Sequence, residues 1–140
     1  MDEAVAGAAV DVVRTYLRFV EARDLDAASA LLDDDVTITF PGGREFHSLG
    51  DQVASSGARF RSVRKTFDHF DTATTDDRGR DHVVVYAFGT LAGTALEGSS
   101  FDSVRFLDRF ELRGGRIISQ MVWNDLAEVG VVSPDRGPQT

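Results

Sequence analysis

The chain has 140 residues, the size of one ordinary domain, and 42% of them are hydrophobic, which is typical of a globular protein with its own core. Its 15 Lys and Arg residues against 23 Asp and Glu residues give a formal net charge of −8, which disfavours binding to nucleic acid or to an anionic membrane surface. The absence of cysteine excludes disulfides and thiolate chemistry.

Targeting signals are not evident in the sequence. The first residues, Met1-Asp2-Glu3, are acidic and predict no secretory signal. The longest apolar runs, such as Val83 to Phe88, are far shorter than the ~20 residues needed to span a bilayer. From these features we expect a soluble, cytoplasmic protein.

Two helices are predicted at the start of the chain. From about Ala4 to Ala22, charged residues recur every three or four positions along one face. Tyr16 lies on the opposite side of this helix and is expected to point into the interior. Asp24 is a suitable N-cap for a second, shorter helix, which is expected to end at the run Asp33-Asp34-Asp35.

The rest of the chain is predicted to be mostly β-structure. Val36 to Phe40 alternates as a half-buried strand does, and a third helix is plausible from about Leu49 to Ser62. Further strands are predicted at Arg64 to Thr74, Val83 to Ala92, Phe101 to Leu112 and Arg116 to Leu126. Helices followed by a run of strands predict an α+β fold with helices on one face of a curved antiparallel sheet.

Asp108 breaks the pattern of its predicted strand. Its neighbours on the same face are Phe106 and Phe110, so the carboxyl group is expected in apolar surroundings. A carboxylate there costs free energy unless it is protonated, paired or next to a cavity. Two interpretations stay open from the residues alone: a functional carboxyl group, or a structural one that is hydrogen-bonded to a neighbouring backbone amide.

The hairpin at Gly114-Gly115 decides what faces Asp108. A two-residue loop would place Asp108 opposite Met121, whereas a three-residue loop with a bulge at Gly115 would place it opposite Gln120. Alternation cannot choose, because two isoleucines follow Arg116 and a slip of one residue exchanges the two faces. In the second register the face of Asp108 also carries three further side chains: Gln120, Val122 and Asn124.

The three histidines are weak candidates for chemistry. His69 would be a possible base if it faced the interior, although a strand histidine is more often an ordinary, partly buried residue. His47, after the Pro-Gly-Gly turn, and His82, at the start of a strand, are both expected to be exposed. Their spacing matches no metal-binding motif, so we expect no metal site.

Several stretches of the sequence resemble the nuclear transport factor 2-like superfamily, and within it the SnoaL-like polyketide cyclases and ketosteroid isomerases. The matching stretches are Val12 to Tyr16, Glu21 to Leu25, Leu31 to Val36, Phe40-Pro41, Asp108 to Leu112 and Gly115 to Ile118. The resemblance implies one domain over residues 1–132, followed by a loose tail at 133–140. It also implies a cone, in which a curved sheet wraps the long N-terminal helix as in a cystatin-like α+β barrel, with an internal hydrophobic pocket and a dimer through the outer sheet face. It favours the three-residue hairpin loop.

The resemblance carries over to only part of an active site. Tyr16 falls where ketosteroid isomerases keep their oxyanion-hole tyrosine, and Asp108 falls where they keep a protonated aspartate beside it. The position of the isomerase's general-base aspartate is Phe40 here, and the acid–base aspartate of the cyclases appears as Val122. The usual general-base positions are therefore apolar.

Two functional hypotheses follow. In the first, the protein is a cofactor-independent isomerase, cyclase or dehydratase acting on a hydrophobic ketone, with Tyr16 and Asp108 polarising the carbonyl and His69 or a water moving the proton. In the second, it binds an apolar small molecule or serves as an accessory dimerisation module, without chemistry. The residues expected to contact the ligand are Phe40, Phe106, Phe110, Gln120, Val122 and Asn124. A protonated Asp108 is expected, because no basic side chain shares its face in the favoured register.

Overall fold

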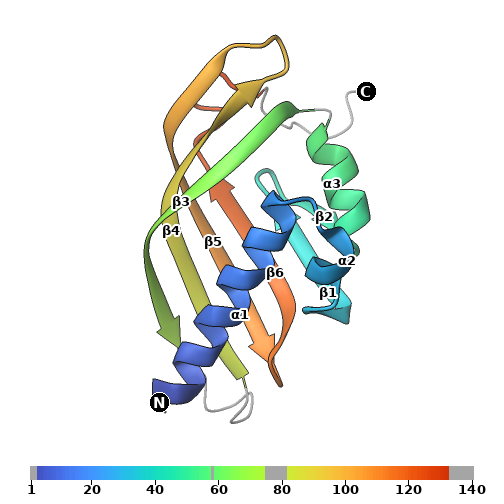
Figure 1. Cartoon of the computed structure of the whole chain (residues 1–140), viewed down its shortest axis with the longest axis vertical. Helices are drawn as coiled ribbons and strands as arrows, with labels where there is room; N and C mark the ends of the chain where they lie inside the picture. Colours follow the sequence, from blue (N-terminus) through green and yellow to red (C-terminus); the bar gives the residue numbers. More distant parts are fainter. Residues whose placement is uncertain (1–2, 58, 75–81, 133–140) are drawn as a thin grey trace.

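A computed structural model describes residues 3–57, 59–74 and 82–132. Its elements, in chain order, are α1 (Glu3–Glu21), α2 (Leu25–Ser29), β1 (Leu32–Phe40), β2 (Arg44–Phe46), α3 (Leu49–Gly57), β3 (Phe60–Ala73), β4 (His82–Ala95), β5 (Ser100–Arg113) and β6 (Arg116–Asn124). The strands form one curved sheet in the order β2-β1-β6-β5-β4-β3, which stays open between its edges β2 and β3 (Figure 1). The predicted α+β cone is confirmed.

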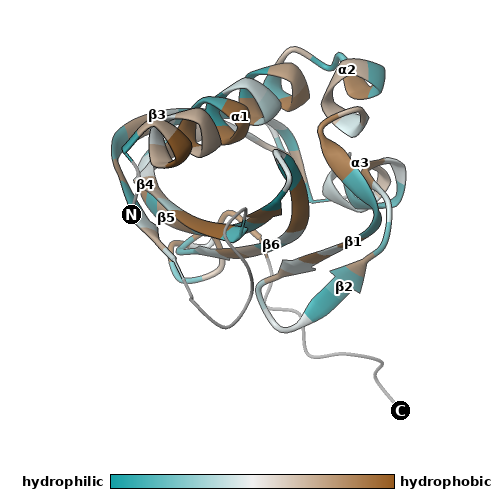
Figure 2. Cartoon of the chain, turned by 90° about the horizontal axis from the view of Figure 1, so that it is seen from below, coloured by the Kyte–Doolittle hydropathy of each residue, from teal (hydrophilic) through white to brown (hydrophobic). Residues whose placement is uncertain are grey.

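Helix α1 lies across the concave face of the sheet (Figure 2). Its inward side buries Val13, Tyr16 and Leu17 against the strands, as the charged stripe on the opposite face predicts. Asp24 is the N-cap of α2 and accepts a hydrogen bond from the backbone N–H of Ala27 at 3.3 Å. None of the helices in the described part of the chain has the length and apolar character needed to cross a bilayer.

Some predicted boundaries and pairings are wrong. The run Asp33-Asp34-Asp35 lies within β1 rather than at a helix end, and α3 ends at Gly57 because β3 begins at Phe60. β1 pairs with β6 in parallel, so the sheet is not wholly antiparallel. This parallel pairing places Ile38 beside Gln120, which joins the N-terminal third of the chain to its last strand. The expected loose tail at 133–140 lies outside the described residues.

Glycines in β4 permit the strong bend of the sheet. A Cβ atom at Gly89 would lie 2.0 Å from the backbone oxygen of Thr66 in β3, and one at Gly93 would lie 2.0 Å from that of Ser62. Both distances are far below any normal contact, so only glycine lets β3 approach β4 this closely. The bend carries β3 around toward the concave face, where α1 also lies (Figure 2).

The β5–β6 hairpin combines features of both predicted registers. Its loop is the two-residue Gly114-Gly115 turn, with φ of 59° and 78°, and Arg113 pairs with Arg116. The ladder then shifts by one residue, since Leu112 pairs with Ile117 but Glu111 pairs with Ser119. The favoured three-residue loop is therefore wrong. The later bulge nevertheless gives the expected faces, and the residue opposite Asp108 is Val122 rather than Gln120 or Met121.

Candidate functional site

A cavity of about 380 Å³ opens between the concave face of the sheet, α1 and α3. Its volume lies within the range of small-molecule sites, ~300–1,000 Å³. Apolar and polar side chains both line it, and seven of the nine residues expected at the site are among them: Tyr16, Phe40, Phe106, Asp108, Gln120, Val122 and Asn124. The structure thus brings together residues from α1, β1, β5 and β6.

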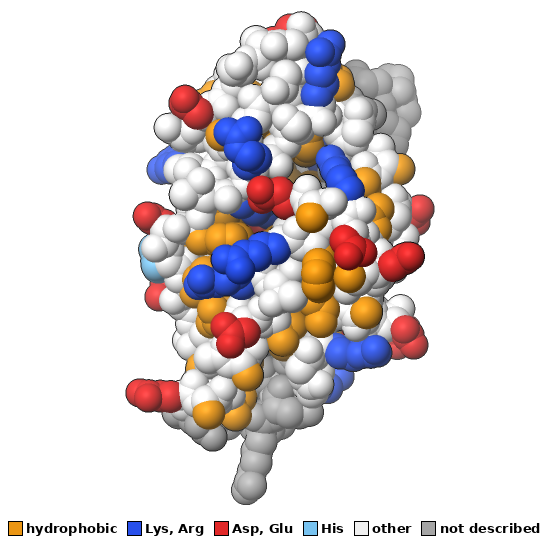
Figure 3. Space-filling view, in the orientation of Figure 1, with side chains coloured by type: hydrophobic (Ala, Val, Ile, Leu, Met, Phe, Trp, Pro, Cys, Tyr) orange, Lys and Arg blue, Asp and Glu red, His pale blue; other side chains and the backbone are white. Residues whose placement is uncertain are grey.

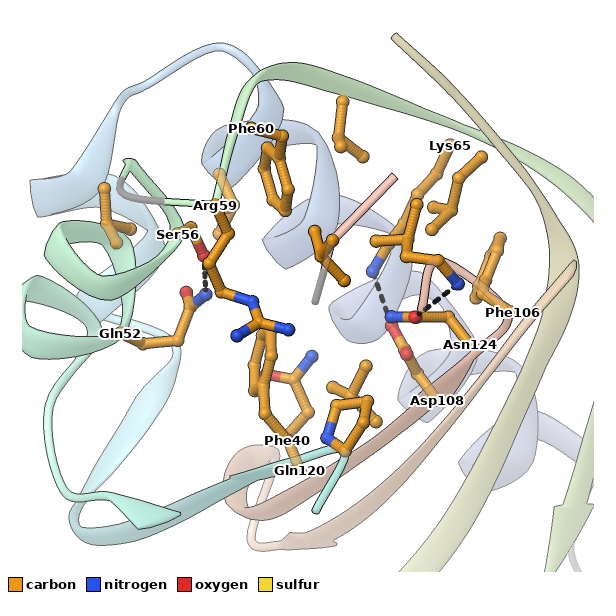
Figure 4. Close-up of a pocket in the computed structure, with 18 of the residues that line it drawn as sticks. Phe40, Gln52, Ser56, Arg59, Phe60, Lys65, Phe106, Asp108, Gln120 and Asn124 are labelled. Atoms are coloured by element: carbon orange, nitrogen blue, oxygen red, sulfur yellow. Dashed lines mark hydrogen bonds and ion pairs between the residues drawn. The ribbon is translucent and has the colours of Figure 1, made fainter. Parts of the chain in front are cut away.

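Asp108 is paired with a lysine from a distant strand. Its side chain is fully buried, and its Oδ2 atom accepts a hydrogen bond from Lys65 Nζ at 2.6 Å (Figure 4). Lys65 belongs to β3, two strands away from Asp108 in the sheet, and the curvature described above brings the two side chains together. The expectation that no basic side chain shares the surroundings of Asp108 is therefore wrong.

The sequence does contain a signal for Lys65. In β3 it shares the inner face with Val63 and Phe67, just as Asp108 shares the inner face of β5 with Phe106 and Phe110. The ammonium group also lies 4.9 Å from the centre of the Phe106 ring. Two residues of opposite charge, each on the apolar face of its own strand, can form a buried ion pair.

The environment of Asp108 makes it a stronger base than an ordinary carboxylate. Burial raises the pKa of Asp108, while the Lys65 ammonium and the neighbouring Gln120 amide oppose this rise in its pKa. The second carboxyl oxygen, Oδ1, is buried and has no hydrogen-bond partner among the described residues. An oxygen of this kind beside a cavity is available to a ligand.

Tyr16 provides a hydroxyl group next to this pair. The side chain is 2% exposed, and its hydroxyl donates a long hydrogen bond of 3.4 Å to Gln120 Oε1. Burial, and then the nearby charge of Asp108, raise the pKa of Tyr16 well above its ordinary value. Tyr16 therefore stays a neutral phenol and acts as a hydrogen-bond donor. Phe110 packs edge-on against its ring at 6.1 Å and does not line the cavity, contrary to the expectation of ligand contact.

His69 does not face the cavity. The ladder between β3 and β4 shifts at Asp68, because Phe67 pairs with Gly89 but His69 pairs with Phe88. This bulge turns two successive residues outward, so His69 is exposed and its ring stacks on that of Phe88 at 4.4 Å. His69 was a candidate base only if it faced the interior, and in the structure it does not. The spacing of Phe67 and Phe70, which both pack on the core, is the local sign of the broken alternation.

The other two histidines also lie outside the cavity. His82 is fully buried, contrary to expectation, with Nε2 at 3.1 Å from Glu111 Oε2. His47 is exposed, as predicted. Among the residues that the structure describes, no group of three or more His, Asp or Glu side chains is arranged to hold a metal ion.

The α3 end of the cavity is polar, a feature that was not predicted from the sequence. Gln52 and Ser56 lie one helical turn apart on the inner side of α3, and Gln52 Nε2 donates to Ser56 Oγ at 2.6 Å. Arg59 follows three residues later, and its guanidinium group extends over Phe40 into the cavity (Figure 4). The i, i+4, i+7 spacing of these polar residues is the signal that could have revealed them.

Comparisons with known proteins agree with the fold. Solved structures similar to this chain include an NTF2-like protein of unknown function from Burkholderia pseudomallei (TM-score 0.72, 22% identity, covering 90% of this chain and 98% of that one). They also include TerC co-crystallised with polyporic acid (0.70, 18%, 89% and 97%) and a candidate polyketide cyclase from Xanthomonas campestris pv. campestris (0.63, 17%, 88% and 94%). A search of curated proteins found no match. The sequence pattern of the SnoaL-like domain matches residues 13–120, and the chain belongs to this family.

Proposed function

We propose that this SnoaL-like protein is an enzyme of the isomerase or cyclase type that moves a proton on a hydrophobic cyclic ketone bound in the cavity. The observation that carries the proposal is the Asp108 carboxyl group, with one oxygen held by Lys65 at 2.6 Å and the other buried without a partner among the described residues. A purely structural ion pair has no need of an open oxygen beside a cavity.

In the proposed mechanism Asp108 is the general base. Its Oδ1 atom takes a proton from the carbon next to the carbonyl group, and the C–H electron pair forms the enolate. Lys65 holds Oδ2 and so orients the carboxylate. Where the ketone carries a β,γ double bond, the enolate is conjugated with it, and the same proton returned to the γ carbon gives the α,β-unsaturated isomer.

Tyr16 is the proposed donor to the carbonyl oxygen. Its hydrogen bond to Gln120 Oε1 is long, at 3.4 Å, so little is lost when the hydroxyl turns from Gln120 to a ligand. A neutral donor aimed at the developing oxyanion stabilises the transition state more than the ground state. Gln120 and Asn124 flank the same region and would orient the ring system.

One observation favours a second candidate, a binding protein without chemistry. Phe40 and Val122, at the positions where related isomerases and cyclases are expected to carry aspartates, both line the cavity as apolar side chains. With Asp108 withdrawn into an ion pair, the cavity would then hold an apolar molecule and leave it unchanged.

Hydrogen–deuterium exchange of a simple ketone distinguishes the two candidates. We expect the protein to accelerate exchange of the acidic protons of 2-tetralone in D2O, measured by proton NMR, and Asp108→Asn to lower the enzymatic rate by about 10²–10⁴-fold. Asp125→Asn is the matched control, because Asp125 pairs with Arg105 at 2.6 Å outside the cavity. Binding of 2-tetralone with no acceleration would leave the binding protein as the function.

A further inference from the structure

We infer that the α3 end of the cavity is a binding subsite for an acidic substituent, so that the ligand is a ring compound carrying a carboxylate. The subsite consists of Gln52, Ser56 and Arg59. The inference rests on the proposed use of the cavity as a small-molecule site, but not on Asp108 acting as a base.

Two of the three side chains are polar groups buried at inward helix positions, which are usually apolar. Gln52 is 8% exposed and Ser56 is 7% exposed, and both lie on the inward side of an amphipathic helix. Burying an amide and a hydroxyl costs free energy that apolar residues of similar size would not cost. Their mutual hydrogen bond of 2.6 Å satisfies one donor and leaves the hydroxyl hydrogen of Ser56 to point elsewhere.

Arg59 supplies the positive charge. It lies in the turn between α3 and β3, and its backbone N–H donates to the carbonyl oxygen of Ser56 at 2.9 Å. This bond fixes the start of its side chain next to Ser56. Figure 4 shows the guanidinium group inside the cavity, between Gln52 and the Phe40 ring, well apart from Asp108. A planar guanidinium donates two parallel hydrogen bonds to a carboxylate.

The charges around the cavity are the reverse of those on the whole chain. Among the described lining residues, Arg23, Arg44, Arg59 and Lys65 are basic, against Glu21 and Asp108 as acids, whereas the net charge of the chain is −8. Both acids already have partners: Asp108 pairs with Lys65, and Glu21 Oε2 accepts the backbone N–H of Lys65 at 3.3 Å.

Basic side chains thus outnumber acidic ones along the described part of the cavity lining. Arg44 stays near the subsite, where its Nη1 donates to Ser55 Oγ at 3.2 Å and its guanidinium lies 5.9 Å from the Phe40 ring centre. On the face over which α1 lies, basic and acidic side chains are interspersed, so the excess of basic groups belongs to the cavity lining (Figure 3). A cavity lined by more basic than acidic side chains attracts an anion to a protein whose net charge is negative.

The two ends of the cavity would then recognise different groups of one ligand. The Asp108 end offers a base and the Tyr16 hydroxyl, which suit a ketone, while the Arg59 end offers the guanidinium and the Ser56 hydroxyl as donors, which suit a carboxylate. Phe40 and Phe60 lie beside Arg59, Phe106 lies beside Lys65, and these three rings would contact those of the ligand (Figure 4). The substrate class is thus a hydrophobic cyclic keto acid.

Calorimetric titration with 2-naphthoate and 2-naphthamide tests the subsite, because the two share their rings and differ in charge. We expect wild-type protein to bind 2-naphthoate about 10- to 100-fold more tightly, the range of a charged hydrogen bond. Arg59→Met should abolish this preference and leave the affinity for 2-naphthamide within about 2-fold, since a neutral amide gains little from the guanidinium. Arg64→Met, at an exposed arginine of β3 outside the cavity, is the matched control and should keep the preference.

Equal affinities of the wild type for both compounds would overturn the inference, and this comparison needs no variant to fold. A preference that persists in Arg59→Met would overturn it as well. The subsite and the proposed function fail separately. Exchange of 2-tetralone, which has no carboxylate, tests Asp108 alone, and the naphthoate preference tests Arg59 alone.

Discussion

The Lys65–Asp108 pair is the residue-level feature on which the proposed chemistry depends. Burial raises the pKa of Asp108, and Lys65 is the largest influence that lowers the pKa again. The proposed base is active when ionised, so the rate must rise with pH as Asp108 loses its proton. Removing Lys65 takes away the lowering influence and moves this rise to higher pH.

The first prediction is therefore a shift of the pH–rate profile in Lys65→Met. Exchange of 2-tetralone is expected to rise with pH in both proteins, with the rising limb at higher pH in the variant. Rates measured by NMR over a series of buffers would show it. A wild-type rate that falls as pH rises would instead mean that Asp108 acts protonated, as a donor beside Tyr16.

A second prediction concerns Phe40, which lines the cavity where ketosteroid isomerases are expected to keep their general base. A Δ5-ketosteroid should bind to the wild type and isomerise poorly. Phe40→Asp should raise its isomerisation rate, by up to about 10²–10⁴-fold where the geometry allows. The conjugated product absorbs in the ultraviolet, which gives the assay. Rapid turnover by the wild type would show that the steroid needs no base at position 40 and that Asp108 serves it instead.

At the scale of elements, the bend between β3 and β4 sets the shape of the cavity. A methyl group at Gly89 would meet the Thr66 carbonyl at 2.0 Å and the Phe106 ring at 2.8 Å. Gly89→Ala should therefore destabilise the fold by about 1–3 kcal/mol or more, as overpacking does. Gly7→Ala, in α1 with nothing within 4 Å of the added atom, should stabilise it by about 0.5–1 kcal/mol. Urea unfolding measures both changes. Equal stabilities would show that the sheet relaxes freely at Gly89.

Elements were predictable where the signal is local. Periodicity and capping chemistry within a few residues predict the inward side of α1 with Tyr16, the Asp24 cap and the strand containing Asp108. The bulges at Asp68 and after Ile117 were not, because a ladder shift depends on the partner strand as well as on its own residues. One bulge removed His69 from the site, and the other decided what faces Asp108.

The pairing of Lys65 with Asp108 could not be predicted from the sequence. The two residues are 43 positions apart and two strands apart, and only the curvature permitted by glycines in β4 joins them. Alternation places each side chain on the inner face, but it says nothing of how tightly the sheet curls. Candidate residues can therefore be found from sequence, whereas their partners require the folded sheet.

At the scale of the whole molecule, we predict a homodimer through the outer face of the sheet. Leu107 and Trp123 are paired across β5 and β6 on this face, Met121 lies beside them, and Trp123 is 46% exposed. A large apolar side chain at the centre of a sheet face is typical of an interface core. Light scattering in the micromolar range should give twice the mass of the chain.

Trp123→Arg should weaken the dimer by about 2 kcal/mol or more, as loss of an interface hot spot does. Leu96→Arg, an equally exposed change in the β4–β5 turn, should leave it intact. A monomer mass for the wild type would show that this face is solvated.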